Sequence, residues 1–279
     1  MKTYRPLRTS FRNKWNNFND ILEIYFPRSQ PPVGTPYGFQ MVTTRSMYHK
    51  AMLDGSFELD EVKVIQRHLT TVDVFIDAGA NIGFYTCLAR AAGKQAIAFE
   101  PLNRNLNYLY TNLVLNGWKD VEVFPLGLGS HVDVAPFYTA STTGASLIEH
   151  WAGLSTRFKQ TIPVTTLDNV LGKRFSGKKL LIKIDVEGAE YFVVSGAQVL
   201  LQLSPKPLWF VEIFLSEHHP GGLNPYFART FELFWKYGYE THTANEENAS
   251  VTASDVDRWI RARKSDWVDC NYYIMIPKA

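Results

Sequence analysis

The stretch at residues 74–101, VFIDAGANIGFYTCLARAAGKQAIAFEP, constrains the fold of this chain more than any other. An apolar run at 74–77 leads into a glycine turn, a helix at 84–92 and a second apolar run at 96–100. A strand, a helix and a strand in this order form a right-handed crossover between parallel strands. The sequence therefore predicts an open, mostly parallel sheet whose ligand lies beyond the carboxyl ends of its strands.

The same alternation continues along the chain. Helices are predicted at 104–116 and 189–201, and strands at 121–124, 180–185 and 208–214. The C-terminal runs YGYETHTA and CNYYIMI differ, because no helix follows the second of them, and an antiparallel pair that closes a mixed sheet fits them. The predicted fold class is therefore α/β, with a doubly wound sheet that is covered by helices on both faces.

The N-terminal region reads as an extension of this domain. Residues 1–30 carry six basic and two acidic side chains, and aromatic and leucine residues recur every three or four positions within 10–26. This spacing predicts an amphipathic helix, which either packs on the main domain or contacts a partner or a membrane surface. A proline- and glycine-rich linker follows, so we place an extension and linker at 1–37 and the main domain at 38–279.

The main domain carries one polar insertion, at about 245–269. Ser254, Asp255, Val256 and Asp257 suggest a capping box for a helix that contains VDRWIRARK. Two interpretations stay open for this insertion: a plain surface segment, or a lid over the substrate.

Charge and cysteine content narrow the function classes. The 29 Lys and Arg residues against 27 Asp and Glu residues give a net charge of +2, so a nucleic acid is not the expected partner. The two cysteines, Cys87 and Cys270, favour a reducing compartment and small core positions. The chain shows no apolar run of the kind that a signal peptide or a membrane span needs, and we expect a cytoplasmic protein.

The glycine turn itself predicts a nucleoside cofactor. Gly79 and Gly83 let the backbone turn tightly and approach a ligand, and Glu100 at the end of the next strand can accept hydrogen bonds from both ribose hydroxyls. Asn81 stands where a dinucleotide-binding turn needs glycine, and Asp77 suits a positively charged ligand better than a phosphate. S-adenosylmethionine is thus favoured over a nicotinamide dinucleotide. A turn that merely packs helix against strand would leave the two acids unexplained.

A second motif, LIKIDVEGAEYFVVSGA at 181–197, combines with VFIDAGANIGFYT, AFEP, VTTLDNVL and TGASL. Together these strings resemble the FkbM family of S-adenosylmethionine-dependent methyltransferases, over roughly Gly38 to Ile276 and with Gly55 to Glu58 at the front edge. The resemblance implies a class I methyltransferase (Rossmann-like) sheet of seven strands with the last one antiparallel. It also implies methylation of hydroxyl oxygens, commonly on sugars, glycans or natural products.

The resemblance also assigns cofactor contacts. Asp77, Gly79, Asn81 and Gly83 would border the methionine part of the cofactor, and Glu100 would hold the ribose. Further contacts would come from Pro101, Gly127 and Asp185. Where the family places a polar or acidic residue on the adenine side, this chain has Leu128, so that recognition would fall to the backbone.

The catalytic candidates lie at strand ends. Methyl transfer to a hydroxyl needs alignment and a proton acceptor, and Asp185, at the end of its strand, is the first candidate. Glu212 interrupts an apolar strand, where it either pairs with a base such as Lys183 or faces the active site beside Asp185. His218 is a third candidate, in a loop at the same sheet edge. Glu187 and Glu190 follow on the turn and the first helical residues, where acids at a helix N-terminus are the alternative interpretation, and this interpretation is favoured for Glu190.

Metal assistance and other classes of protein stay open. Asp185 and Glu212 with a histidine would form an oxygen-rich site that suits Mg or Mn, but no metal site is assigned firmly. A nucleic-acid methyltransferase is disfavoured because Asp185-Val186-Glu187-Gly188 replaces the Pro-Pro-aromatic signature of base amino methylation. The remaining alternative is a non-catalytic protein that binds the cofactor and engages a partner. The expected acceptor is a small molecule or a glycan.

Overall fold

The structure is a computed structural model that describes residues 31–44, 46–139, 144–267 and 270–278. The amphipathic helix expected within 10–26 lies outside these residues. In the described part of the chain, no helix is both long and apolar enough to cross a membrane.

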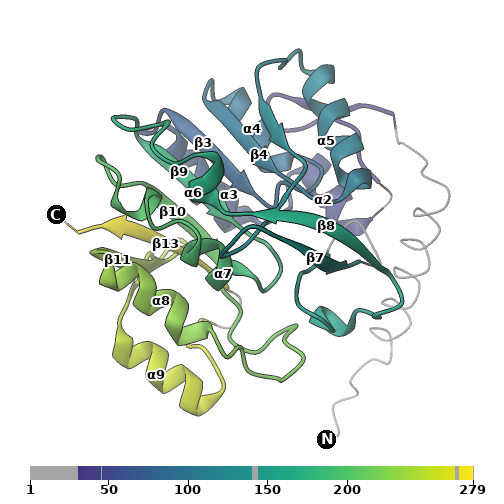
Figure 1. Ribbon diagram of the computed structural model, residues 1–279. Coiled ribbons are helices and arrows are strands. Elements are labelled where there is room, and N and C mark those ends of the chain that lie inside the picture. The colour runs from purple at the N-terminus through teal and green to yellow at the C-terminus, as the bar shows by residue number, and fades with distance from the viewer. Residues whose placement is uncertain (1–30, 45, 140–143, 268–269, 279) are drawn as a thin grey trace, which may run out of the picture.

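The central element is a sheet of eight strands. From one edge to the other, the strands are β12 (Ser250–Val251), β11 (Tyr239–Thr243), β13 (Tyr272–Pro277), β10 (Leu208–Glu212), β9 (Leu180–Ile184), β3 (Val74–Ala78), β4 (Gln95–Phe99) and β5 (Glu122–Phe124). The five strands from β10 to β5 are parallel, whereas β13 runs antiparallel to both of its neighbours. The expected seven-stranded sheet with a reversed last strand is therefore confirmed, with the two-residue β12 added at one edge (Figure 1).

Helices cover both faces of this sheet (Figure 1). The helices are α2 (Met47–Asp54), α3 (Leu59–Leu69), α4 (Phe84–Ala91), α5 (Asn103–Leu115), α6 (Leu167–Val170), α7 (Glu190–Ser195), α8 (Phe227–Lys236) and α9 (Ala253–Ala262), with 3-10 turns at Trp151–Gly153 and Leu200–Gln202. Two smaller sheets are formed by β1 (Val33–Gly34) with β2 (Gln40–Met41), and by β6 (Gly127–Leu128), β8 (Lys159–Thr165) and β7 (Asp133–Tyr138).

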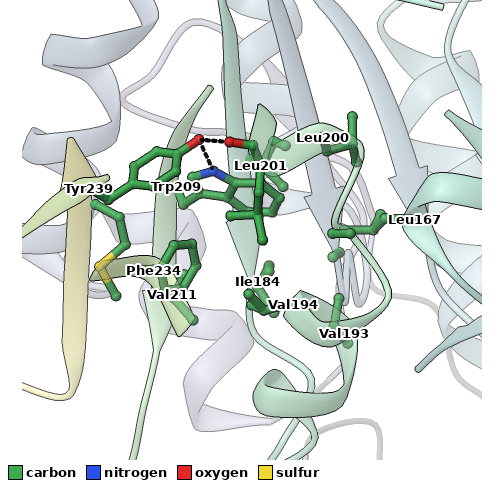
Figure 2. Packing of buried hydrophobic residues seen from close by; sticks show 14 of the residues in the cluster. Leu167, Ile184, Val193, Val194, Leu200, Leu201, Trp209, Val211, Phe234 and Tyr239 are labelled. Atoms are coloured by element: carbon green, nitrogen blue, oxygen red, sulfur yellow. Dashed lines mark hydrogen bonds between the residues drawn. The ribbon is translucent and has the colours of Figure 1, made fainter. Parts of the chain in front are cut away.

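The two faces of the sheet enclose two cores. Side chains alternate along a strand, so Val74, Ile76 and Ala78 of β3 join the core under α7 and α8, whereas Phe75 joins the core under α3 and α4. Figure 2 shows the first core, in which the indole N–H of Trp209 donates to the hydroxyl of Tyr239 (3.2 Å). That hydroxyl donates in turn to the carbonyl of Leu201 (3.2 Å). Trp209 and Tyr239 are thus buried there with their polar atoms paired.

The strands and helices lie close to their expected positions, with two corrections. The helix expected at 189–201 ends at Ser195, and Gly196, a residue of low helix propensity, occupies the C-cap position. The capping box of α9 is formed by Thr252 and Asp255 rather than by residues 254–257. Cys87 and Cys270 are free and buried, as expected.

Candidate active site

A pocket opens at the carboxyl edge of the sheet, where β3, β4 and β9 end. Six of the expected cofactor residues line it: Gly79, Asn81, Glu100, Pro101, Gly127 and Asp185. The expected residues Asp77, Gly83, Glu212 and His218 do not belong to its wall in the described part of the chain. Segments far apart in the sequence therefore meet where the motifs predicted a ligand.

The glycine turn shapes one end of this pocket. Gly79 has φ 87°, and a Cβ at this position would lie 1.8 Å from the carbonyl oxygen of Asp185 on the neighbouring strand. Gly83, with φ 89°, precedes α4 and packs against Leu109, whose Cγ would lie 3.1 Å from an added Cβ. Only glycine combines these positive φ values with such close approaches. The N–H groups of Gly79 and Ala80 donate to the carbonyl of Phe99, and that of Gly83 donates to the carbonyl of Ala80, so the turn is closed by its own backbone hydrogen bonds.

Asn81 is a second unusual residue in this turn. It has φ 51°, in the left-handed region that non-glycine residues seldom adopt. Its Oδ1 atom is buried and has no hydrogen-bond partner among the described residues. A buried acceptor of this kind is costly unless a ligand donates to it. The turn thus fits a ligand that carries a hydrogen-bond donor.

Glu100 is held in place by the backbone around it. Its two carboxylate oxygens accept from the N–H of Asn81 and from the N–H of Leu102, both at 2.8 Å. Burial raises the pKa of Glu100 to about 7, although these hydrogen bonds lower it in part. The carboxyl group can therefore change its charge near neutral pH.

The far end of the pocket is apolar. Its wall is formed by Leu126, Leu128, Phe137, Ala145 and Leu147. Phe137 comes from β7 of the small sheet, an element that the sequence analysis did not identify. The alternation of DVAPFY is too weak to separate a strand from a loop, so this wall could not be predicted.

A buried lysine lies beneath the turn. Lys183, on β9, is 1% exposed, and its Nζ atom lies 2.9 Å from Oδ2 of Asp185 and 3.9 Å from Oδ1 of Asp77. Asp77 also accepts from the hydroxyl of Thr86 at 2.6 Å, and burial raises its pKa. The Asp77 Oδ1 atom has no hydrogen-bond partner within the described chain. Lys183 thus pairs with two acids, and not with Glu212.

Asp185 is the ionised member of this network. Its side chain is 22% exposed, and its Oδ2 atom also accepts from the hydroxyl of Tyr272 at 3.0 Å. Burial alone would raise the pKa of Asp185, but the Lys183 ammonium, together with hydrogen bonds from Lys183, Glu212 and Tyr272, holds it below its ordinary value. A charged carboxylate therefore faces the pocket.

Glu212 lies beside Asp185, as one of its two expected positions required, but it does not line the pocket that it was expected to face. The strands β10 and β9 are paired, and Glu212 is itself opposite Tyr272 on β13. Burial, and then the negative charges of Asp185 and Glu187, raise the pKa of Glu212 well above its ordinary value. Because a protonated carboxyl can donate, Glu212 serves as a hydrogen-bond donor to Asp185.

Glu187 and Glu190 occupy the turn after β9. Glu187 lines the pocket and accepts from the indole N–H of Trp151 (2.8 Å) and from the N–H of Gly144 (3.1 Å). Burial raises the pKa of Glu187 to about 7 and that of Glu190 to about 8. Glu190 accepts from the N–H groups of Val186 and Gly188 at the start of α7, which supports its interpretation as an acid at a helix N-terminus.

His218 lies outside this pocket, in the loop after β10. Its ring packs on Trp151 and Phe214, at centroid distances of 5.8 Å and 4.9 Å. It borders an open hollow together with His150 and His219. Trp151 contacts both sites: its ring packs on His218 beside the hollow, and its indole N–H donates to Glu187 in the pocket.

The described residues contain no group of three or more His, Cys, Asp or Glu side chains that is arranged to hold a metal ion. The magnesium or manganese site considered for Asp185 and Glu212 therefore has no support in the described part of the chain.

Known proteins of similar fold include several methyltransferases. An S-adenosylmethionine-dependent methyltransferase from Agrobacterium tumefaciens is 10% identical, with a TM-score of 0.43 over 90% of this chain and 70% of that one. A TehB-like methyltransferase from Corynebacterium glutamicum is 12% identical, with a TM-score of 0.41 over 83% and 94%. The ribosomal protein L11 methylase of Lactobacillus delbrueckii subsp. bulgaricus is 10% identical, with a TM-score of 0.38 over 64% and 67%.

Comparison of sequences is more decisive than these distant structural similarities. No curated protein sequence matches the chain. The model of the methyltransferase FkbM domain matches residues 77–241, which is more than half of the 279 residues and includes the second motif and the first motif from Asp77 onward. The chain therefore belongs to the FkbM family of S-adenosylmethionine-dependent methyltransferases.

Proposed function

We propose that this protein transfers a methyl group from S-adenosylmethionine to a hydroxyl oxygen of a sugar, a glycan or a natural-product small molecule. The observation that carries the proposal is the Asp185 carboxylate. It faces the pocket, stays ionised beside Lys183 and is partly exposed, so it can meet a hydroxyl group from outside.

The pocket residues fit the cofactor. Glu100 would accept hydrogen bonds from the two ribose hydroxyls, and the buried Oδ1 atom of Asn81 would accept one from the ammonium group. The apolar wall that contains Leu128 and Phe137 would pack against the adenine ring.

The chemistry needs few protein groups. S-adenosylmethionine supplies a methyl group bound to a positively charged sulfur. The Asp185 carboxylate would orient the acceptor hydroxyl toward this methyl group and would take up its proton, and S-adenosylhomocysteine would be the leaving group. Lys183 and Tyr272 fix the orientation of Asp185, and Glu212 keeps its own proton and donates to Asp185. Glu212 and Tyr272 thus act through Asp185.

The cofactor is tested first, by thermal unfolding with S-adenosylmethionine, S-adenosylhomocysteine, NAD and NADP. A ligand at a hundred times its dissociation constant stabilises the folded state by about 2.7 kcal/mol, which raises the midpoint by several degrees. We expect a shift with the two S-adenosyl compounds. A shift with NAD or NADP alone would overturn the proposal.

The acceptor is tested second, by screening glycans and small hydroxylated molecules for transfer of a labelled methyl group. With the acceptor found, Asp185→Asn should reduce kcat about a hundredfold or more, because general base catalysis contributes roughly 10²–10⁴. Asp120→Asn, which removes an exposed carboxylate paired with Arg90, is the control. Full turnover by Asp185→Asn would exclude this residue as the base.

A further inference from the structure

Glu58 is a strained acid that lies upstream of the residues matched by the family model. It directly precedes α3 and has φ 40° and ψ 57°, in the left-handed region that a glutamate seldom adopts. Its side chain turns inward instead of capping the helix, and its Oε2 atom accepts from the hydroxyl of Tyr85 at 2.5 Å. The surrounding structure therefore holds this carboxyl group in a costly conformation.

A short series of contacts links Glu58 to the pocket. The ring of Tyr85 lies 4.9 Å from the Nζ atom of Lys183, and Lys183 pairs with Asp185. Burial, and then the charge of Asp185, raise the pKa of Glu58 to about 8. Glu58 therefore lies within electrostatic reach of the pocket-lining carboxylate.

This part of the site carries more acid than the lysine can neutralise. The ammonium group of Lys183 pairs with Asp77 and Asp185, whereas the raised pKa values of Glu58 and Glu212 keep these two carboxyl groups protonated near neutral pH. In addition, Oδ1 of the fully buried Asp77 has no hydrogen-bond partner among the described residues. A positively charged ligand would favour the ionised form of Glu58 in this site.

We propose that Glu58 supplies a negative charge for the positively charged amino acid end of the cofactor, which bears an ammonium group and a sulfonium group. This inference rests on the proposed function, because it takes S-adenosylmethionine as the cofactor. Tyr85 is the positioning residue that holds the Glu58 carboxylate toward Lys183 and the pocket.

The test compares three adenosine compounds by titration calorimetry. S-adenosylmethionine carries both positive charges, S-adenosylhomocysteine keeps the ammonium group alone, and 5′-methylthioadenosine carries neither. For Glu58→Gln we expect the dissociation constant of S-adenosylmethionine to rise roughly tenfold, because one charge-assisted interaction is lost, and that of methylthioadenosine to stay unchanged. A loss confined to S-adenosylmethionine assigns Glu58 to the sulfonium, and an equal loss for S-adenosylhomocysteine assigns it to the ammonium.

Two further variants complete the experiment. Asp60→Asn removes an exposed carboxylate from the first turn of α3, where Asp60 pairs with Lys63, and it should bind all three compounds like the unaltered protein. Tyr85→Phe keeps the carboxylate but frees it, so we expect a smaller loss with the same preference among the compounds. Thermal unfolding shows whether Glu58→Gln folds. If it does not fold, the binding of the three compounds by Tyr85→Phe tests the inference.

Two results would overturn the inference while the proposed function stands. One is unchanged binding of S-adenosylmethionine by Glu58→Gln, and the other is an equal loss for all three compounds, which would indicate a structural role. If the unaltered protein binds none of the three, the proposed function and this inference both fail.

Discussion

The two faces of the central sheet differ in how they treat polar atoms. On the face under α7 and α8, Trp209 and Tyr239 are buried with their polar atoms paired to each other and to a backbone carbonyl (Figure 2). On the face under α3 and α4, Lys183 and Asp77 are equally buried, yet one oxygen of Asp77 has no hydrogen-bond partner within the described residues. The polar atoms of the Trp209–Tyr239 pair are satisfied, whereas this oxygen of Asp77 is not.

A single strand shows the same difference. In β9, Ile182 and Ile184 enter the first core, and Lys183 between them points to the other face. A chain optimised for stability alone would place an apolar residue at Lys183. We therefore interpret the apolar face as the one that stabilises the fold. On the other face, buried charged groups lower stability, and we relate them to ligand binding.

The largest expected effect tests the stable face. Trp209→Ala should lower the free energy of unfolding by about 4 kcal/mol, because it removes a fully buried indole and leaves a cavity. Chemical denaturation measures the loss, and calorimetry on the folded fraction should give an unchanged dissociation constant for S-adenosylmethionine. If Trp209→Ala keeps its free energy of unfolding but no longer binds S-adenosylmethionine, the proposed difference between the two faces is wrong.

The next prediction concerns the other face. Lys183→Met should lower the free energy of unfolding by about 3 kcal/mol at pH 7.5, because Asp77 and Asp185 are left as buried charges without their partner. The loss should shrink at pH 5.5, where the two acids can take up protons instead. Denaturation at both pH values measures this change.

Lys178→Met is the control for that variant, since Lys178 is an exposed lysine just before β9. It should change stability little at either pH. A loss for Lys183→Met that is the same at both pH values would indicate a packing defect rather than unpaired charge.

The smallest expected effect is a pH dependence of cofactor binding. The pKa of Glu100 is raised from 4.5 to about 7 by burial, so its contribution to folding stability is present below pH 4.5 and is lost as pH rises through 7. The affinity for the cofactor has the opposite pH dependence and rises with pH, because the ribose hydroxyls donate to the ionised carboxylate. The affinity for S-adenosylmethionine should fall up to tenfold per pH unit below 7, about 1.4 kcal/mol per unit.

Calorimetry between pH 5.5 and 8 measures this dependence, and Glu100→Gln should bind more weakly with a flatter profile. A profile that is equally steep in Glu100→Gln would assign the titration to another acid of the site, such as Glu187.

The sequence predicted what local patterns can determine. The apolar runs located the parallel strands to within one or two residues, and the glycine turn placed Gly79, Asn81 and Glu100 at one edge of the sheet. These features depend on neighbouring residues and on the rule that parallel strands share an edge. The functional roles of these residues stay predictions.

Contacts across the chain could not be predicted in the same way. Tyr272 reaches Asp185 because β13 inserts antiparallel beside β10, and a single sequence does not specify this pairing. The sequence likewise did not determine which acid pairs with Lys183. A lysine within an apolar strand did indicate that it needs a partner of opposite charge. Glu58 lay at the front edge of the family resemblance without an assigned role, and Trp151 gave no pattern, because a turn and a loop bring them to the site.

The strands at the two edges of the large sheet are short: β12 has two residues and β5 has three. An exposed edge presents unpaired N–H and C=O groups that can pair with a strand of another molecule, and long edges promote aggregation. Edges of this length offer few such groups. The eight-stranded sheet is therefore poorly suited to pair edge to edge with a strand of another molecule.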